Sequence, residues 1–108
     1  MTDSIGFENL ASVDEIPHEG TLPVMRSDGT PICLIKSQGR ISAVADNCTH
    51  QDFEMALGDV LPDGSIQCAW HGARFDCFTG QVKQGPAAQA LRVFPVKVDG
   101  GRVLVGRG

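Results

Sequence analysis

Short apolar runs alternate with turn residues along most of the chain, and this pattern predicts strands rather than helices. The clearest pair is Ile32–Ile35 and Ile41–Ala45, which we expect to form a hairpin across a glycine-containing turn. Further strands are predicted at Phe7–Ala11, Leu22–Met25, Ser65–Cys68, Ala73–Phe78, Leu91–Val98 and Arg102–Val105. The first is followed by a turn that ends at Pro17, and Pro95 predicts an edge position for the run that contains it. Strands at this spacing predict an all-β sandwich or barrel of antiparallel sheets.

The regular alternation lapses between Ala45 and Ser65, where only Glu54–Leu57 predicts a single helical turn. We interpret this stretch as a loop that carries ligands, and residues 68–71 as a second one. Both ligand loops are expected at the tips of neighbouring hairpins. A third loop, with Gly85-Pro86, is predicted over Gln84–Ala88.

Length, charge and apolar content narrow the class of protein. A chain of 108 residues predicts one domain, 1–108. The first residues lack a basic run followed by an apolar core, and no window resembles a membrane span, so we expect a cytoplasmic protein without a membrane partner. A net charge of −4 disfavours a nucleic-acid partner, because phosphate binding needs clustered Lys and Arg.

Four cysteines in a reduced compartment are expected to be metal ligands or buried apolar residues. Cys33 and Cys77 have no histidine nearby in the sequence, and we assign them to the core. The other two form mixed pairs, Cys48-x-His50 and Cys68-x2-His71, separated by seventeen residues. Two thiolates and two imidazoles predict a four-ligand metal site.

The order of these ligands narrows the choice of metal centre. Structural zinc sites usually bring like ligands together in each pair, with longer spacers, whereas both pairs here are mixed. A Rieske-type 2Fe-2S centre has two thiolates on one iron and two imidazoles on the other, which fits one ligand of each kind from each loop. A zinc site and a core cluster without metal are the remaining interpretations.

At these residues the chain resembles the small Rieske ferredoxins that serve bacterial ring-hydroxylating dioxygenases. The resemblance is carried by Cys48-Thr49-His50, Cys68-x-x-His71-Gly72, Phe75-Asp76, Thr79-Gly80 and Gly85-Pro86. It implies a Rieske-type fold in which residues of about 46–88 form a cluster-binding part with two ligand loops and a proline-containing covering loop. It also implies that Cys48 and Cys68 ligate the inner iron and that His50 and His71 ligate the outer iron.

The same resemblance implies a low reduction potential. Rieske proteins of cytochrome bc complexes have a disulfide between the loops, but the matching positions here are Phe53 and Trp70. Those proteins also have a serine and a tyrosine whose hydroxyls bond to cluster sulfurs, where this chain has Ala73 and Phe75. Fewer hydrogen bonds to the sulfurs predict a potential near the bottom of the Rieske range. Trp70 is expected either to shield the cluster or to face a partner.

The function implied is that of a one-electron carrier, not an enzyme. Electrons would pass from an NAD(P)H-dependent ferredoxin reductase to a terminal oxygenase, with docking near His50 and His71. His18 is the remaining histidine, so the chain lacks the two-histidine and carboxylate set of a non-haem iron oxygenase. Two alternatives stay open: a Rieske small subunit of a nitrite-reductase-like complex, and a protein associated with redox sensing or iron-sulfur assembly.

Overall fold

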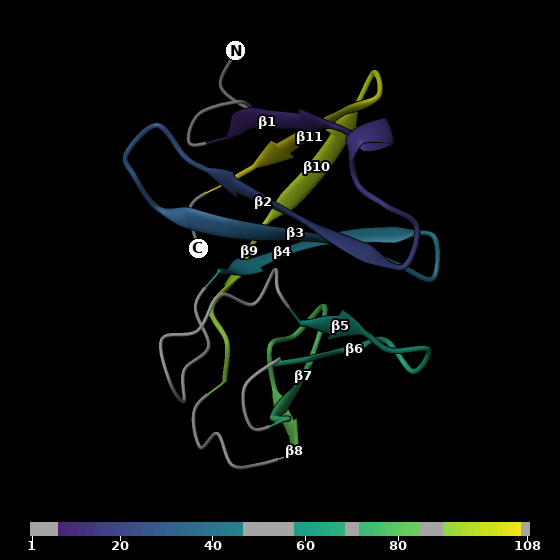
Figure 1. Cartoon of the computed structure of the whole chain (residues 1–108). Coiled ribbons are helices and arrows are strands. Elements are labelled where there is room, and N and C mark those ends of the chain that lie inside the picture. The colour runs from purple at the N-terminus through teal and green to yellow at the C-terminus, as the bar shows by residue number, and fades with distance from the viewer. Residues whose placement is uncertain (1–6, 47–57, 69–71, 85–89, 107–108) are drawn as a thin grey trace.

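The computed structural model describes residues 7–46, 58–68, 72–84 and 90–106 and arranges them in antiparallel sheets (Figure 1). The strands are β1 Glu8–Ser12, β2 Gly20–Met25, β3 Pro31–Ser37, β4 Arg40–Ala45, β5 Asp59–Val60, β6 Ser65–Gln67, β7 Arg74–Asp76, β8 Val82–Gln84, β9 Val93–Phe94, β10 Val96–Asp99 and β11 Arg102–Val105. A 3-10 turn, η2, covers Val13–Glu15. None of the helical segments in these ranges has the length and apolar character needed to span a membrane.

The described strands form three sheets, which we call the terminal, central and small sheets. The terminal sheet has the order β1-β11-β10, the central sheet β2-β3-β4-β9 and the small sheet β5-β6-β7-β8. Figure 1 shows the central sheet between the other two. The all-β antiparallel fold class predicted from the sequence is confirmed.

The predicted hairpin in the central sheet is present, with β3 paired to β4. Its turn residues Gln38 and Gly39 have φ angles of 55° and 75°. Two consecutive left-handed residues are the signature of a type I′ turn, whose twist matches that of the flanking strands. The predicted turn after β1 is also present as η2, where the Glu15 carboxylate accepts a hydrogen bond of 2.8 Å from the Ser12 backbone N–H.

The run Leu91–Val98, predicted as a single strand, is divided at Pro95. β9 pairs with β4 in the central sheet, whereas β10 pairs with β11 in the terminal sheet. Proline has no N–H to continue the ladder, so the chain leaves one sheet there and enters the other. The Pro95 carbonyl accepts a hydrogen bond of 2.8 Å from the Gly106 N–H. β9 and β10 both lie at sheet edges, as the proline predicts.

The expectation of two ligand loops at neighbouring hairpin tips is correct for one of them. Residues 68–73 connect β6 to β7, which pair with each other. Residues 46–58 instead connect β4, in the central sheet, to β5, in the small sheet. Both edges of β4 are already paired, with β3 and β9, so the following strand has no free edge there. The helical turn predicted at 54–57 lies outside the described residues.

The central strand β3 is buried on both faces, and this divides the core in two. Ile32 and Leu34 face the terminal sheet, while Cys33 and Ile35 face the small sheet, and all four are fully buried. The core on the small-sheet side contains Cys33, Ile35, Val44, Ile66, Cys68, Ala73, Phe75, Cys77 and Leu91. The core on the terminal side contains Ala11, Ile16, Ile32, Leu34, Ala43, Phe94, Val103 and Val105.

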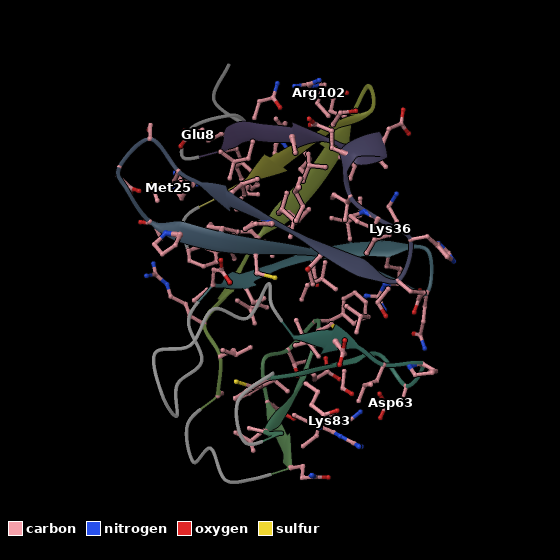
Figure 2. All side chains as sticks on the ribbon, in the orientation of Figure 1. Glu8, Met25, Lys36, Asp63, Lys83 and Arg102 are labelled. Atoms are coloured by element: carbon pink, nitrogen blue, oxygen red, sulfur yellow. The ribbon has the colours of Figure 1, made fainter. Side chains whose placement is uncertain are left out.

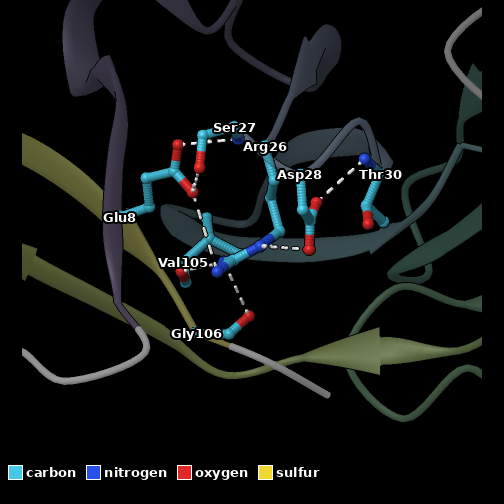
Figure 3. Close-up of polar contacts among 7 residues, drawn as sticks. All are labelled: Glu8, Arg26, Ser27, Asp28, Thr30, Val105 and Gly106. Atoms are coloured by element: carbon cyan, nitrogen blue, oxygen red, sulfur yellow. Dashed lines mark hydrogen bonds and ion pairs between the residues drawn. The ribbon is translucent and has the colours of Figure 1, made fainter.

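Polar contacts fix the three sheets to one another. On the terminal side, the buried Arg26 guanidinium donates to the carbonyl oxygens of Val105 and Gly106 at 2.6 and 3.2 Å and lies 3.6 Å from Glu8 (Figure 3). On the small-sheet side, Gln38 Nε2 donates to the Pro62 carbonyl at 2.9 Å. The Arg40 guanidinium lies 4.0 Å from the centre of the Phe78 ring.

Gly80 provides a test of how tightly the small sheet is closed. It has a φ of 75°, and a Cβ at this position would overlap the Leu91 carbonyl oxygen. We expect Gly80→Ala to destabilise the fold by roughly 2–5 kcal/mol, from overlap and left-handed strain together. In Gly29→Ala, where φ is 90° and nothing lies within 4 Å, only the strain of about 1–2 kcal/mol remains. Thermal melting of both variants measures the difference, and equal losses of stability would contradict the close approach.

Candidate metal centre

The structure describes one of the four predicted ligands, Cys68. Cys48, His50 and His71 lie outside the described residues, as do Trp70 and Pro86. The described part of the candidate site therefore consists of Cys68 and the residues that flank the three predicted loops.

Cys68 follows β6 directly and is 2% exposed. Side chains alternate along this strand, so Ile66 and Cys68 face the core while Gln67 lies on the other face. The Cys68 backbone N–H donates to the Ala73 carbonyl at 2.7 Å, which extends the β6–β7 hairpin beyond its last strand pair. This bond holds the thiol in an apolar core at the base of the predicted second ligand loop.

Gly72 reverses the chain directly after the predicted ligand His71. Its φ is 74°, a left-handed conformation that glycine adopts without steric cost. Its carbonyl accepts a hydrogen bond of 3.5 Å from Gln67 Nε2, and a Cβ on Gly72 would lie 3.0 Å from the same nitrogen. The glycine in the motif Cys68-x-x-His71-Gly72 therefore has a structural reason in the tight return of the loop.

The three predicted loops leave the small sheet at the same end. Asp59, Gln67, Arg74 and Gln84 form one cross-strand row over the four strands, through the pairs 59–67, 67–74 and 74–84. β5 begins at Asp59, inside the stretch predicted as the first ligand loop, and the second predicted loop lies between Gln67 and Arg74. Gln84, predicted as the start of the third loop, instead ends β8. Sequence separation alone gives no indication of this row, because it depends on the pairing of β5 and β8.

The turn after β7 is held by Asp76, one of the residues that carried the resemblance. Its Oδ1 accepts hydrogen bonds from the backbone N–H groups of Phe78 and Thr79 at 2.8 and 2.9 Å. Desolvation alone would raise the pKa of Asp76, but these bonds outweigh it and hold the pKa below its usual value. The turn also positions Gly80, whose carbonyl accepts from the Leu91 N–H at 2.7 Å.

The other described cysteines are core residues, as the sequence predicted. Cys33 and Cys77 are fully buried in the same core as Cys68. Burial raises the pKa of Cys77 to about 12, with a contribution from nearby Asp76. Burial likewise raises the pKa of Cys33, with a contribution from Asp46. Both side chains are therefore thiols at neutral pH, whereas metals bind the thiolate.

Comparison with known proteins identifies the family. The sequence model of the Rieske [2Fe-2S] domain matches residues 7–95. The chain belongs to the Rieske family. This confirms the resemblance stated from the ligand motifs and, with it, one Rieske 2Fe-2S cluster as the cofactor.

Similar Rieske proteins have been characterised as ferredoxins of oxygenase systems. The chain is 32% identical to the biphenyl dioxygenase ferredoxin subunit of Pseudomonas sp. (strain KKS102), covering 92% of this chain and 90% of that protein. It is 34% identical to the ferredoxin component of the alkene monooxygenase system of Xanthobacter autotrophicus, covering 96% and 84%. A solved structure, described as a complex of reduced oxygenase and oxidized ferredoxin in carbazole 1,9a-dioxygenase, contains a chain that matches with a TM-score of 0.86 and 25% identity, covering 94% and 93%.

The described residues fit a cluster at this end of the small sheet. Cys68 offers a sulfur ligand from a buried apolar core next to the β6–β7 hairpin, and the neighbouring Ala73 and Phe75 are fully buried and bring no competing polar atoms. Thiolate and imidazole ligands are the donors that iron takes in a Rieske centre.

Alanine substitution separates the ligand cysteine from the core cysteines. Cys68→Ala is expected to abolish cluster incorporation, because it removes a proposed iron ligand. Cys33→Ala and Cys77→Ala remove the same atom from the same core and should retain the cluster, with some loss of stability. Iron and acid-labile sulfide analysis, together with the visible absorption spectrum, provides the measurement. Loss of the cluster in all three variants would argue against a specific role for Cys68.

Proposed function

We propose that this chain is a one-electron carrier that accepts an electron from an NAD(P)H-dependent ferredoxin reductase and delivers it to a terminal ring-hydroxylating oxygenase. The observation that carries the proposal is the match to ferredoxin components over nearly the full length of both proteins. The nitrite-reductase alternative has less support, because these relatives are components of oxygenase systems. A cytoplasmic location and a single domain over 1–108 stay predictions of the sequence.

The proposed ligand set is Cys48 and Cys68 on one iron and His50 and His71 on the other. It is supported by the mixed spacing in the sequence and by the position of Cys68 in a core from which water is excluded. When bound, the cluster supplies reversible one-electron chemistry at a potential above that of an all-cysteine centre. The described residues hold the Cys68 sulfur away from water, and the side of His50 and His71 is the proposed face for partners.

A low potential is supported by the apolar residues around Cys68. Ala73 and Phe75 have no hydroxyl groups and are fully buried. Hydrogen bonds to cluster sulfurs stabilise the reduced form, so their absence at these positions favours a value near the lower end of the Rieske range of about −150 to +300 mV. Such a potential suits electron supply from a flavin reductase and not from a quinol.

Reconstitution with its partners tests the proposed function. The purified protein is reduced by NADH and the reductase encoded beside it, and its reoxidation by the neighbouring oxygenase is followed at the cluster absorption in the presence of oxygen and substrate. We expect rapid reoxidation and hydroxylated product, and neither with Cys68→Ala. Reoxidation by a sirohaem nitrite reductase, but not by any oxygenase, would reject the proposal in favour of the alternative.

Adding a hydroxyl at Phe75 tests the origin of the low potential. In high-potential Rieske proteins the matching tyrosine hydroxyl donates to a ligand thiolate, so Phe75→Tyr should raise the reduction potential by roughly 20–65 mV, the equivalent of one net hydrogen bond. Phe78→Tyr is the control, because Phe78 lies under Arg40 at the margin of the same core. Spectroelectrochemical titration gives both values, and an unchanged potential in Phe75→Tyr would contradict the explanation.

A further inference from the structure

Arg74 is a charged residue in the small sheet that the proposed function does not yet use. It begins β7, directly after the second predicted ligand loop, and lies in register with Gln67 on β6 and Gln84 on β8. Its neighbours on both sides are therefore neutral amides. The residue before it, Ala73, accepts the 2.7 Å hydrogen bond from the Cys68 backbone. Arg74 therefore directly follows the residue that is hydrogen-bonded to Cys68, a proposed iron ligand.

The Arg74 side chain is partly withdrawn from water. The adjacent row, Val60, Ile66, Phe75 and Val82, packs on the core, so Arg74 lies on the opposite face of the sheet. Its Nε atom is nevertheless shielded from solvent and has no hydrogen-bond partner in the described part of the chain. An N–H group that is shielded from water and has no partner reduces stability, so its presence calls for a compensating function.

The positive charge of Arg74 is also uncompensated among the described residues, where no carboxylate oxygen lies within 4.0 Å of it. Nearby charges have other partners: Lys83 pairs with Asp63 at 3.6 Å, and Asp76 accepts two backbone hydrogen bonds. The contrast is Arg26, which is buried between Glu8 and Asp28 (Figure 3). Arg74 thus adds a positive charge at the end of the sheet from which the three loops leave, in the same cross-strand row as Asp59 but separated from it by Gln67.

We propose that the positive charge of Arg74 stabilises the reduced state of the proposed cluster and thereby raises its reduction potential. The inference rests on the ligand set proposed above. Uptake of one electron adds one negative charge to the site, and a cation in a partly desolvated position interacts favourably with that charge. Arg74 thereby offsets part of the lowering caused by Ala73 and Phe75, which keeps the carrier reducible.

Charge-removing and charge-retaining variants test this proposal by spectroelectrochemical titration. In Arg74→Gln the equilibrium constant for reduction should fall three- to tenfold, where tenfold corresponds to 59 mV for one electron. Arg74→Lys should remain within twofold of the wild type. Arg102→Gln removes the same charge from β11, at the end of the molecule opposite Lys83 (Figure 2), and should leave the constant within twofold. The difference in this constant between the wild type and Arg74→Gln should become smaller at high salt, because salt screens the charge.

Several results would overturn the proposal. One is an equilibrium constant for reduction of Arg74→Gln that stays within twofold of the wild-type value while the cluster spectrum is intact. Another is an equal fall of this constant in Arg74→Gln and Arg74→Lys. If Arg74→Gln fails to hold the cluster, Gln84→Lys tests the proposal instead, because Gln84 is exposed and in register with Arg74. An added charge there should raise the constant, and no change would reject the proposal. The EPR spectrum of the reduced wild type reports the ligand set separately. A wrong ligand assignment would change this spectrum, whereas an Arg74 charge without effect on the potential would leave it as expected for a Rieske cluster.

Discussion

The burial of β3 on both faces is the constraint on which the other parts of the structure depend. A strand whose side chains are apolar on both sides must be covered by two layers. The terminal sheet covers Ile32 and Leu34, and the small sheet covers Cys33 and Ile35. The small sheet is thus fixed to the rest of the protein through the same core that contains Cys68. The position of the candidate centre is in this sense a consequence of how the central strand is buried.

The strands of the small sheet are only two or three residues long. Such strands form few ladder hydrogen bonds, so closure of the sheet depends on turns and on contacts with its neighbours. Gln38 and Arg40 provide two of these contacts from the β3–β4 hairpin, and Gly80 provides another against Leu91.

Local chemistry determined which parts of the structure could be predicted from the sequence. The β3–β4 hairpin and the core positions of Cys33 and Cys77 follow from nearby residues, and both predictions are confirmed. The division at Pro95 and the path from β4 to β5 were missed, because they depend on which distant strands pair. The two-residue strands β5 and β9 are too short for an alternation pattern. The unpartnered Nε of Arg74 also depends on packing that no motif encodes.

The two kinds of cysteine in one core explain why folding and cluster binding should be coupled at this end of the molecule. The core holds Cys33 and Cys77 as protonated thiols, because burial disfavours the thiolate. Cys68 is buried in the same core, yet the proposed role requires a thiolate. A buried anion is tolerated only when a positive charge compensates it, and ligation to iron provides that compensation. With the proposed ligation of Cys68, the cluster would stabilise the short strands that help to bind it, and the proposed role of Arg74 would add a further positive charge near the site of reduction.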